Sequence, residues 1–322
     1  MRRPSPSRRS PRAKAALAAP RRRHVATTLG AALLFAGSFP AAAHAQREIS
    51  GSRIDTTFAF RATGRIDISV PAGDIIVSGW NRDEVRVQAR SERGDLEVHA
   101  STATLDVRAS AVARRLGETR LELTVPRRAS VTMNSHLGAL TIRDFAGDVT
   151  ANATSGTVVL ADLTGTATLQ TVTGDIRGER IGGRIKATAV NGNVVLQNAD
   201  AEIAASTTNG RILLTAIRSQ SVKAGSINGT VEFEGAFHPQ GTYAFQAHNG
   251  NITFYIPDGT GATLEVGTYS GHLESDIPLT LGGGRIRGQQ RYTFTLGGGG
   301  ATISALSYSG NIFIRRAPRP NR

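Results

Sequence analysis

The chain has 322 residues, of which 20% are charged, with a formal net charge of +13 and no cysteine. This length permits one or two domains with a sizeable core. The lack of cysteine excludes disulfides, thiolate metal sites and lipid attachment through a cysteine. Nine Lys and Arg fall within the first 45 residues, which hold no acid, so removing these nine leaves a charge of +4. The remaining positive charges are scattered, and we predict no nucleic-acid partner.

Residues 1–45 have the organisation of a secretory signal peptide. A basic front precedes an apolar segment, Val25–Phe39, and Ala43-His44-Ala45 supplies small residues at a cleavage position. Arg8-Arg9 and Arg21-Arg22 leave twin-arginine export open beside the general secretory route. No later apolar run approaches ~20 residues, the length that spans a bilayer. We therefore predict an exported protein that does not span the membrane and lies in the periplasm, on the outer surface or outside the cell.

Residues 46–137 are predicted to form an N-terminal β cap. Apolar and polar residues alternate in Ile66–Val70 and Leu121–Val125, as they do in half-buried strands. Pro126 ends the second of these, because proline cannot donate a hydrogen bond to a neighbouring strand. Ala109–Leu116 is the one segment with helical character. We expect antiparallel strands that cover the first coil of the following repeat, whose end would otherwise be an open sheet edge.

Residues 138–314 form a repeat. Glycines recur every nine residues from 138 to 192, and every second one closes a unit of 18 residues that lengthens to 19 and 21 further on. Fixed self-similarity at this length is the signature of a solenoid. The unit glycines are Gly156, Gly174, Gly192, Gly210, Gly229, Gly250, Gly271 and Gly310.

Side chains at fixed distances from the unit glycine define the strands. The third residue before the glycine is always small, and the second residue after it is always Val, Ile or Leu. The latter are Val158, Ile176, Val194, Ile212, Val231, Ile252, Leu273 and Ile312. Such columns, with a period of two inside each arm, indicate parallel strands stacked coil upon coil. We predict an all-β fold, a single-stranded parallel β-solenoid (β-helix) of about 18 residues per coil, with a right-handed winding favoured.

The last residues, 315–322, contain two prolines and four arginines. A short polar terminus of this composition cannot bury enough apolar surface to order itself. We therefore expect a disordered basic tail.

The repeat columns hold few residues that could bind a metal ion or take part in catalysis. Calcium-binding nonapeptide repeats share the nine-residue period but need oxygen ligands in every unit. The matching column, directly after the unit glycine, holds Thr157, Asp175, Asn193, Arg211, Thr230 and Asn251. We predict no calcium site. His248 and His272 come from successive coils at different positions and lack a third ligand, so we predict no transition-metal site either.

Glu232 and Glu234 share a strand face, and Glu265 and Glu274 lie about one coil away. Paired carboxylates of this kind catalyse glycoside hydrolysis when they face each other across a substrate. A solvated outer face is the simpler interpretation. Trp80 is expected to pack between the cap and the first coil rather than to form a ligand platform. We predict no catalytic or cofactor site.

A polar outer face remains as the candidate binding surface. Its members are Thr150, Asn152, Thr168, Gln170, Thr188, Ser206, Gln246 and Thr253. Flat polar β faces can bind polysaccharide, and they can also serve solubility alone.

Three segments carry a resemblance to a known family. They are Gly73–Trp80, Asp83–Val87 and Leu123–Pro126, followed by many coils of the form Ser/Asn-Gly-x-Ile. This arrangement resembles a family of exported bacterial proteins called "putative adhesin", a domain of unknown function with a β-solenoid fold. The resemblance covers most of residues 50–316 and implies the fold, but it supplies no catalytic or binding residues.

We predict a non-enzymatic, exported, adhesin-like or cell-envelope scaffold protein that binds envelope polysaccharide or a surface protein through its polar face. Two alternatives stay open. One is a carbohydrate-active lyase or hydrolase built on a β-helix, and the other is a sensor domain of the envelope.

Overall fold

A computed structural model describes residues 47–92, 94–109, 119–281 and 291–318 of the chain. The predicted signal peptide, residues 1–45, and most of the predicted helix, Ala109–Leu116, lie outside these residues. The described part is all-β, with 26 strands and no helix. None of its segments could therefore cross a membrane as a helix.

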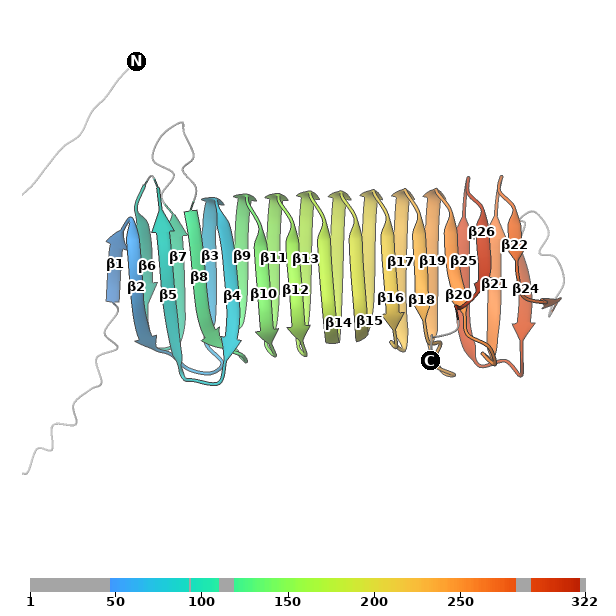
Figure 1. Ribbon diagram of the computed structural model, residues 1–322, viewed down its shortest axis with the longest axis horizontal. Helices are drawn as coiled ribbons and strands as arrows, with labels where there is room; N and C mark the ends of the chain where they lie inside the picture. The colour runs from blue at the N-terminus through green and yellow to red at the C-terminus, as the bar shows by residue number, and fades with distance from the viewer. Residues whose placement is uncertain (1–46, 93, 110–118, 282–290, 319–322) are drawn as a thin grey trace, which may run out of the picture. The chain divides into compact units, whose positions relative to one another are not determined.

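The strands stack side by side in two layers, with the chain passing from one layer to the other at each corner (Figure 1). In spatial order the first layer holds β1 (Arg47–Gly51), β6 (Leu96–Ala100), β7 (Thr104–Ala109), β3 (Arg65–Ala72), β9 (Ser130–Leu137), β11 (Asp148–Ser155), β13 (Thr166–Thr173), β14 (Ile176–Asn191), β15 (Val194–Asn209), β17 (Ser221–Asn228), β19 (Thr242–Asn249), β25 (Ala301–Ser307), β21 (Ala262–Thr268), β24 (Arg291–Leu296) and β23 (Thr280–Leu281).

The second layer follows the same axis. It holds β2 (Arg53–Ala59), β5 (Glu84–Ser91), β8 (Thr119–Pro126), β4 (Asp74–Trp80), β10 (Leu140–Phe145), β12 (Val158–Leu163), the first halves of β14 and β15, β16 (Ile212–Ile217), β18 (Val231–Gly235), β20 (Ile252–Ile256), β26 (Ile312–Arg316) and β22 (Leu273–Ser275).

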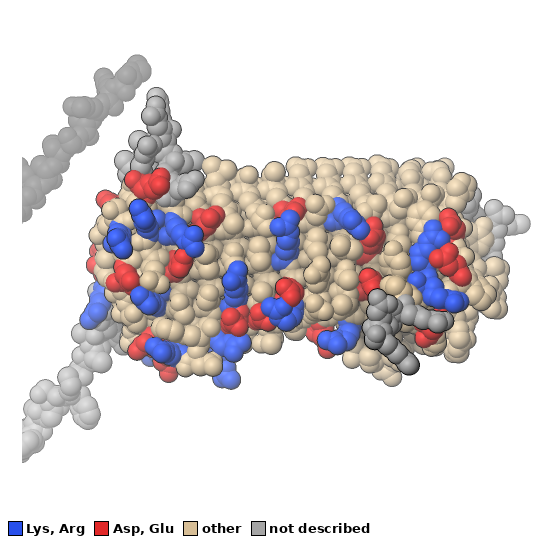
Figure 2. Space-filling model, in the orientation of Figure 1, with Lys and Arg blue, Asp and Glu red and all other residues tan. Residues whose placement is uncertain are grey.

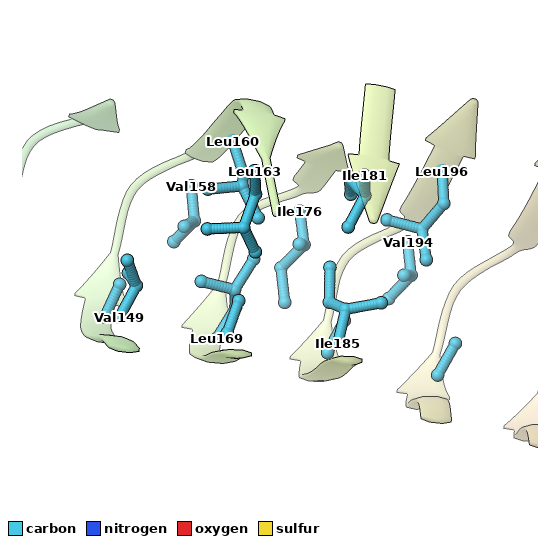
Figure 3. Packing of buried hydrophobic residues seen from close by; sticks show 14 of the residues in the cluster. Val149, Val158, Leu160, Leu163, Leu169, Ile176, Ile181, Ile185, Val194 and Leu196 are labelled. Carbon is cyan, nitrogen blue, oxygen red and sulfur yellow. The ribbon is translucent and has the colours of Figure 1, made fainter. Parts of the chain in front are cut away.

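The core lies between the two layers, and the predicted inward column forms part of it. Val158 lies beside Ile176, and Ile176 beside Val194, each partner 18 positions further along the chain. All three side chains are fully buried (Figure 3). Each contributes roughly 1.5–3 kcal/mol by burial, and each needs the coils on both sides to bury it.

The unit glycines form a column of their own at one corner, which we call the glycine corner. A Cβ atom added to Gly174 would lie 2.2 Å from the carbonyl oxygen of Gly156. The same contact joins Gly156 to Gly138, and Gly192 to Gly174. Gly174 also has a φ of 139°, a conformation that disfavours a side chain. The corner is therefore closed by backbone against backbone, and no other residue fits there.

The opposite corner uses a different device. The residues at 144, 162, 180, 198 and 216, again 18 apart, adopt the left-handed conformation with φ between 53° and 58°. Asp and Asn tolerate this conformation better than most residues, and they occupy three of the five places. At one place Arg180 forms a two-pronged ion pair with Asp162 of the preceding coil, with N–O distances of 2.6 and 2.8 Å.

At the N-terminal end the predicted antiparallel cap is only partly correct. β1 pairs with β6, β6 with β7, β2 with β5, and β5 with β8, all antiparallel. β3 and β4, however, pair in parallel with strands on both sides. The coil they form lies between the coil β7–β8 and the coil β9–β10. Parallel stacking thus begins well before residue 138, and it does not follow chain order.

At the C-terminal end a second coil is inserted out of order. β25 lies between β19 and β21, and β26 lies between β20 and β22. The expected disorder of residues 315–322 is therefore wrong for Arg315 and Arg316, which belong to β26. Ile314 is buried beneath, and Arg315 forms ion pairs with Glu274 at 2.9 Å and Asp276 at 2.7 Å. Residues 319–322 lie outside the described part.

Removal of one whole coil should be tolerated, because the coils share their columns. Deleting residues 174–191 joins Thr173 to Gly192 and lets the next coil take the vacated place. Deleting only residues 174–182 exchanges the two half-turns, which places Ala201 at the glycine corner and the exposed Asn198 in the inward position of Ala189. We expect the first variant to unfold cooperatively in urea and the second to be unfolded or aggregated by circular dichroism. Equal tolerance of both deletions would contradict the 18-residue unit.

The glycine corner predicts a large effect from a single methyl group. Gly174→Ala should destabilise the protein by on the order of 3 kcal/mol, because the added atom overlaps the carbonyl oxygen of Gly156. Gly225→Ala is the matched control, since an added Cβ there meets nothing nearer than 3.8 Å. Urea unfolding midpoints measure both. A Gly174→Ala variant as stable as the control would show that the corner has room for a side chain.

Candidate functional site

Two exposed columns flank the glycine corner. The residue two places before each unit glycine points outward and leaves the strand ladder, as shown by the gap between the pairs Ala153–Thr171 and Ser155–Thr173. Seven large apolar side chains are exposed among the described residues, and five of them stand in this column. These five are Val172, Val190, Ile227, Tyr308 and Tyr269. The exposed apolar side chains are therefore concentrated in one repeated column at the corner and are not distributed at random over the surface.

The column ends in a stack of three aromatic rings. The ring centroids of His248 and Tyr308 are 4.7 Å apart with 9° between the planes. Tyr308 and Tyr269 follow at 4.9 Å and 3°. The insertion of β25 between β19 and β21 brings Tyr308 between its two partners. We call the five apolar residues together with His248 the apolar ridge.

A ladder of amides runs beside the apolar ridge, one residue nearer the glycine. Asn209 donates from Nδ2 to Oδ1 of Asn191 at 2.8 Å, Asn228 donates to Asn209 at 2.8 Å, and Asn249 donates to Asn228 at 3.0 Å. An amide has two N–H donors and a two-fold acceptor oxygen. Each ladder member thus keeps hydrogen-bonding capacity for a ligand outside the protein.

A groove of about 570 Å³ lies along the other flank of the ridge, over β14, β15, β17, β19 and β25. Thr188, Ser206 and Gln246 line one side, with Ile227 and Tyr308 on the ridge side. None of its lining residues is Asp, Glu, Lys or Arg. In Figure 2 the corner edge of the central coils is likewise free of charged side chains. The groove therefore suits an uncharged ligand with both polar and apolar surface.

Gly225 makes the depression. It lies between Ser206 and Gln246 in the row of outward side chains, where every coil from β11 to β19 except its own carries a polar residue. An added Cβ at Gly225 would meet no atom nearer than 3.8 Å. The groove thus follows from the loss of one side chain in a regular row.

The structure brings together seven of the eight residues predicted as a polar face. Thr150 lies beside Thr168, Asn152 beside Gln170, Gln170 beside Thr188, and Thr188 beside Ser206, all in the first layer. Gln246 follows after Gly225. Thr253 does not belong to this face, because it lies on β20 in the second layer.

Of the four glutamates considered for catalysis, Glu232 and Glu234 lie together on β18 and the other two lie apart from them. Glu265 lies on β21 in the first layer, whereas the other three lie in the second. Glu232 forms an ion pair with Arg211, Glu265 with Arg291 at 3.2 Å, and Glu274 with Arg315 at 2.9 Å. Glu232 and Glu234 share the outward face of β18, whereas Glu274 is three strands away and Glu265 lies in the other layer, so the four do not gather at one place.

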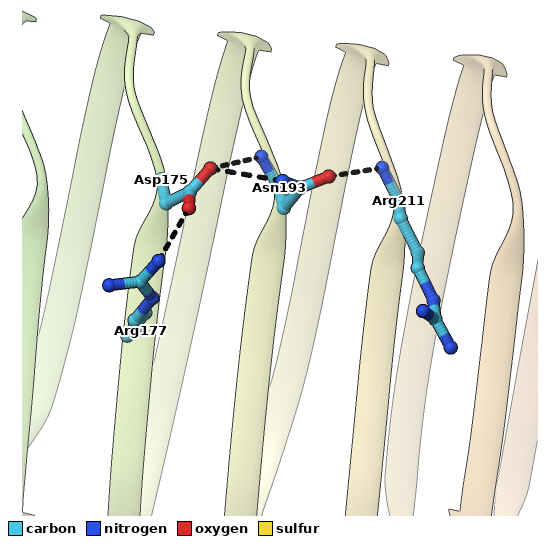
Figure 4. Close-up of polar contacts among 4 residues, drawn as sticks. All are labelled: Asp175, Arg177, Asn193 and Arg211. Atoms are coloured by element: carbon cyan, nitrogen blue, oxygen red, sulfur yellow. Dashed lines mark hydrogen bonds and ion pairs between the residues drawn. The ribbon is translucent and has the colours of Figure 1, made fainter.

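The column once considered for calcium has a structural use. Asp175 Oδ1 accepts hydrogen bonds from the backbone N–H of Asn193 at 3.0 Å and from its Nδ2 at 3.1 Å. Asn193 Oδ1 in turn accepts from the backbone N–H of Arg211 at 2.9 Å (Figure 4). These oxygens are engaged with the next coil. Within the described residues no three His, Asp or Glu side chains lie close enough to hold a metal ion.

The histidines and the tryptophan occupy separate places. His248 and His272 do not belong to adjacent coils, since the inserted β25–β26 coil separates them. Trp80 is half-buried opposite Pro126, and its Nε1 donates to the carbonyl oxygen of Glu84 at 2.7 Å. Arg82 lies 5.0 Å from the ring centroid. These contacts fit a packing role at the β4–β5 turn.

The family of this chain can be identified from its match to a known protein family. Residues 117–315 match the family described as Toastrack DUF4097, a stretch of more than half the chain. The chain belongs to this family. No protein with a curated description matches it.

Several solved structures match the chain at low identity. One described as a putative adhesin from Bacteroides fragilis NCTC 9343 is 14% identical, with a TM-score of 0.37, covering 85% of this chain and 98% of its own. A putative adhesin from Parabacteroides distasonis ATCC 8503 is 11% identical, with a TM-score of 0.44, covering 82% and 97%. A putative lipid binding protein from the same strain is 8% identical, with a TM-score of 0.39, covering 82% and 97%.

The apolar ridge of this Toastrack protein was not predicted from the sequence. A signal was present, because Val172, Val190, Ile227, Tyr269 and Tyr308 all stand directly before the Ser, Thr or Asn that precedes a unit glycine. An apolar residue repeated at a turn, outside the inward column, indicates a surface feature. The contact between Tyr308 and its two partners had no such signal, because it depends on the non-sequential order of the last coils.

Proposed function

We propose that this Toastrack protein is exported to the cell envelope and acts there as an adhesin-like protein that binds neutral polysaccharide along the groove and apolar ridge of the glycine corner, without catalysing a reaction. The observation that carries the proposal is the groove itself. It has the volume of a small-ligand site, it holds no charged side chain, and hydroxyl and amide groups line it opposite apolar ones.

The repeat supports a polymeric ligand. Successive coils present the same column about every 4.8 Å, so one kind of contact recurs along the axis. A polymer of similar units can meet this row many times, and many weak contacts then add to a useful affinity. Sugars carry hydroxyl edges and C–H faces, which match the polar side of the groove and the apolar ridge.

The proposal further rests on the predicted signal peptide and on the ion pairs that the candidate glutamates form. Arginines neutralise three of the four candidate glutamates. Ion pairing of this kind suits a solvated face better than a general acid, which needs a raised pKa.

Substitutions in the groove and in the aromatic stack should weaken binding without unfolding the protein. Gly225→Gln places a side chain in the depression, and Tyr308→Ala removes the centre of the aromatic stack. We expect each to weaken saturable binding to a neutral polysaccharide at least ~10-fold, about 1.4 kcal/mol. The matched control is Thr253→Gln, an outward substitution in the second layer. Binding of the exported protein to an array of envelope polysaccharides measures the effect.

Two outcomes would contradict the proposal. One is a folded protein that shows no saturable binding to any neutral polysaccharide. The other is an equal loss in the Thr253→Gln control. A catalytic role has its own test: if the protein cleaved a glycan, and Glu232→Gln with Glu234→Gln abolished this cleavage, the non-enzymatic part of the proposal would be wrong.

A further inference from the structure

Three arginines stand in one row at the N-terminal end of the second layer. Arg53 on β2 lies directly opposite Arg90 on β5, and Arg90 lies directly opposite Arg120 on β8. Adjacent strands are only ~4.8 Å apart. Figure 2 shows Lys and Arg interspersed with Asp and Glu at this end of the face, over β2, β5 and β8. Like charges directly opposite each other destabilise a sheet, so the row needs an explanation.

The neighbouring acids do not neutralise the whole row. Asp55 accepts two hydrogen bonds from Arg86, both at 3.1 Å, and a third from Gln88 at 3.3 Å. The pKa of Asp55 is lowered chiefly by the hydrogen bond from Arg86, so this carboxylate is ionised and already engaged.

Arg120 has acids on two sides. It donates from Nε to Glu122 at 2.7 Å, and Asp74 is its partner on β4. Asp74 in turn accepts from the backbone N–H of Ala139 at 2.9 Å. Within the described residues, Arg53 and Arg90 form no ion pair and both residues are exposed, although the positive charge of Arg53 also helps to lower the pKa of Asp55.

A hollow of about 220 Å³ opens between these side chains, lined by Arg53, Asp55, Gln88, Arg90, Arg120 and Glu122. The guanidinium group has a planar fork of N–H donors that matches the oxygens of phosphate, which is why arginine prevails in phosphate sites. Arg120 uses only its Nε edge on Glu122, so its other donors remain for a ligand.

We propose that Arg53, Arg90 and Arg120 form a binding site for a tetrahedral phosphate or sulfate group, such as a phosphate ester of an envelope glycan or lipid. An anion between the guanidinium groups removes the repulsion within the row. Glu122 and Asp55 lie in the adjacent row of outward side chains. They orient Arg120 and Arg86, respectively, by accepting hydrogen bonds from them. The site lies in the second layer, away from the corner groove, and it does not rest on the proposed binding of neutral polysaccharide.

The test titrates the exported protein with inorganic phosphate and with sulfate at constant ionic strength, with chloride as the reference salt. Thermal unfolding and amide NMR shifts report binding. We expect saturable stabilisation of the wild type, and at least a ~10-fold loss of affinity in Arg90→Gln. Lys186→Gln with Lys223→Gln is the control, because these exposed first-layer lysines form no ion pair among the described residues.

A second readout separates ligand binding from a structural role. Without phosphate or sulfate, Arg90→Gln should unfold at the same temperature as the wild type or higher, because the substitution relieves repulsion. Vesicles containing phosphatidic acid and a phosphorylated glycan, tested side by side, then distinguish a lipid source of the phosphate from a glycan source. The proposal is overturned if phosphate and sulfate act no differently from chloride, if the lysine control loses affinity equally, or if Arg90→Gln is less stable without the anion.

Discussion

The close approach of glycine to glycine at one corner is the contact on which the remaining structure depends. The backbone of each unit glycine packs against the carbonyl oxygen of the glycine in the preceding coil, from Gly138 through Gly250 and on to Gly310 and Gly271. Because no side chain fits between them, the residues that flank each glycine must point outward. The apolar ridge, the amide ladder and the column of Asp175 and Asn193 are consequences of this constraint. The ridge and the amide ladder of the candidate binding surface therefore depend on the same contact as the fold.

The repeat made much of the fold predictable. Inward columns such as Val158, Ile176 and Val194 follow from a strand period of two combined with the 18-residue spacing. The order of the coils was not predictable. Coils with the same columns can stack on any other coil, so nothing in the periodicity marks that β3–β4 lies between β7–β8 and β9–β10. The same holds for β25–β26 and for the two arginines of the C-terminal segment that lie in β26.

The candidate sites differ in how visible they are in the sequence. The polar row from Thr150 to Gln246 repeats at the coil spacing, and periodicity alone predicts it, apart from Thr253, whose place in the other layer depends on which half-turn it occupies. The groove depends on the single absence of a side chain at Gly225. The arginine row depends on antiparallel pairing between strands 30 or more residues apart, which leaves no periodic trace.

The inserted coil at the C-terminal end affects how strongly the last segment of the chain is held in the solenoid. A terminal coil in an ordinary solenoid has one neighbour, and its loss exposes one set of unpaired backbone groups. β26 instead pairs on both sides, with β20 and with β22, and β25 does the same between β19 and β21. Withdrawing the C-terminal segment would therefore break two ladders in each layer and would also remove Tyr308 from between His248 and Tyr269. The integrity of the aromatic stack is thus coupled to the closure of the C-terminal end.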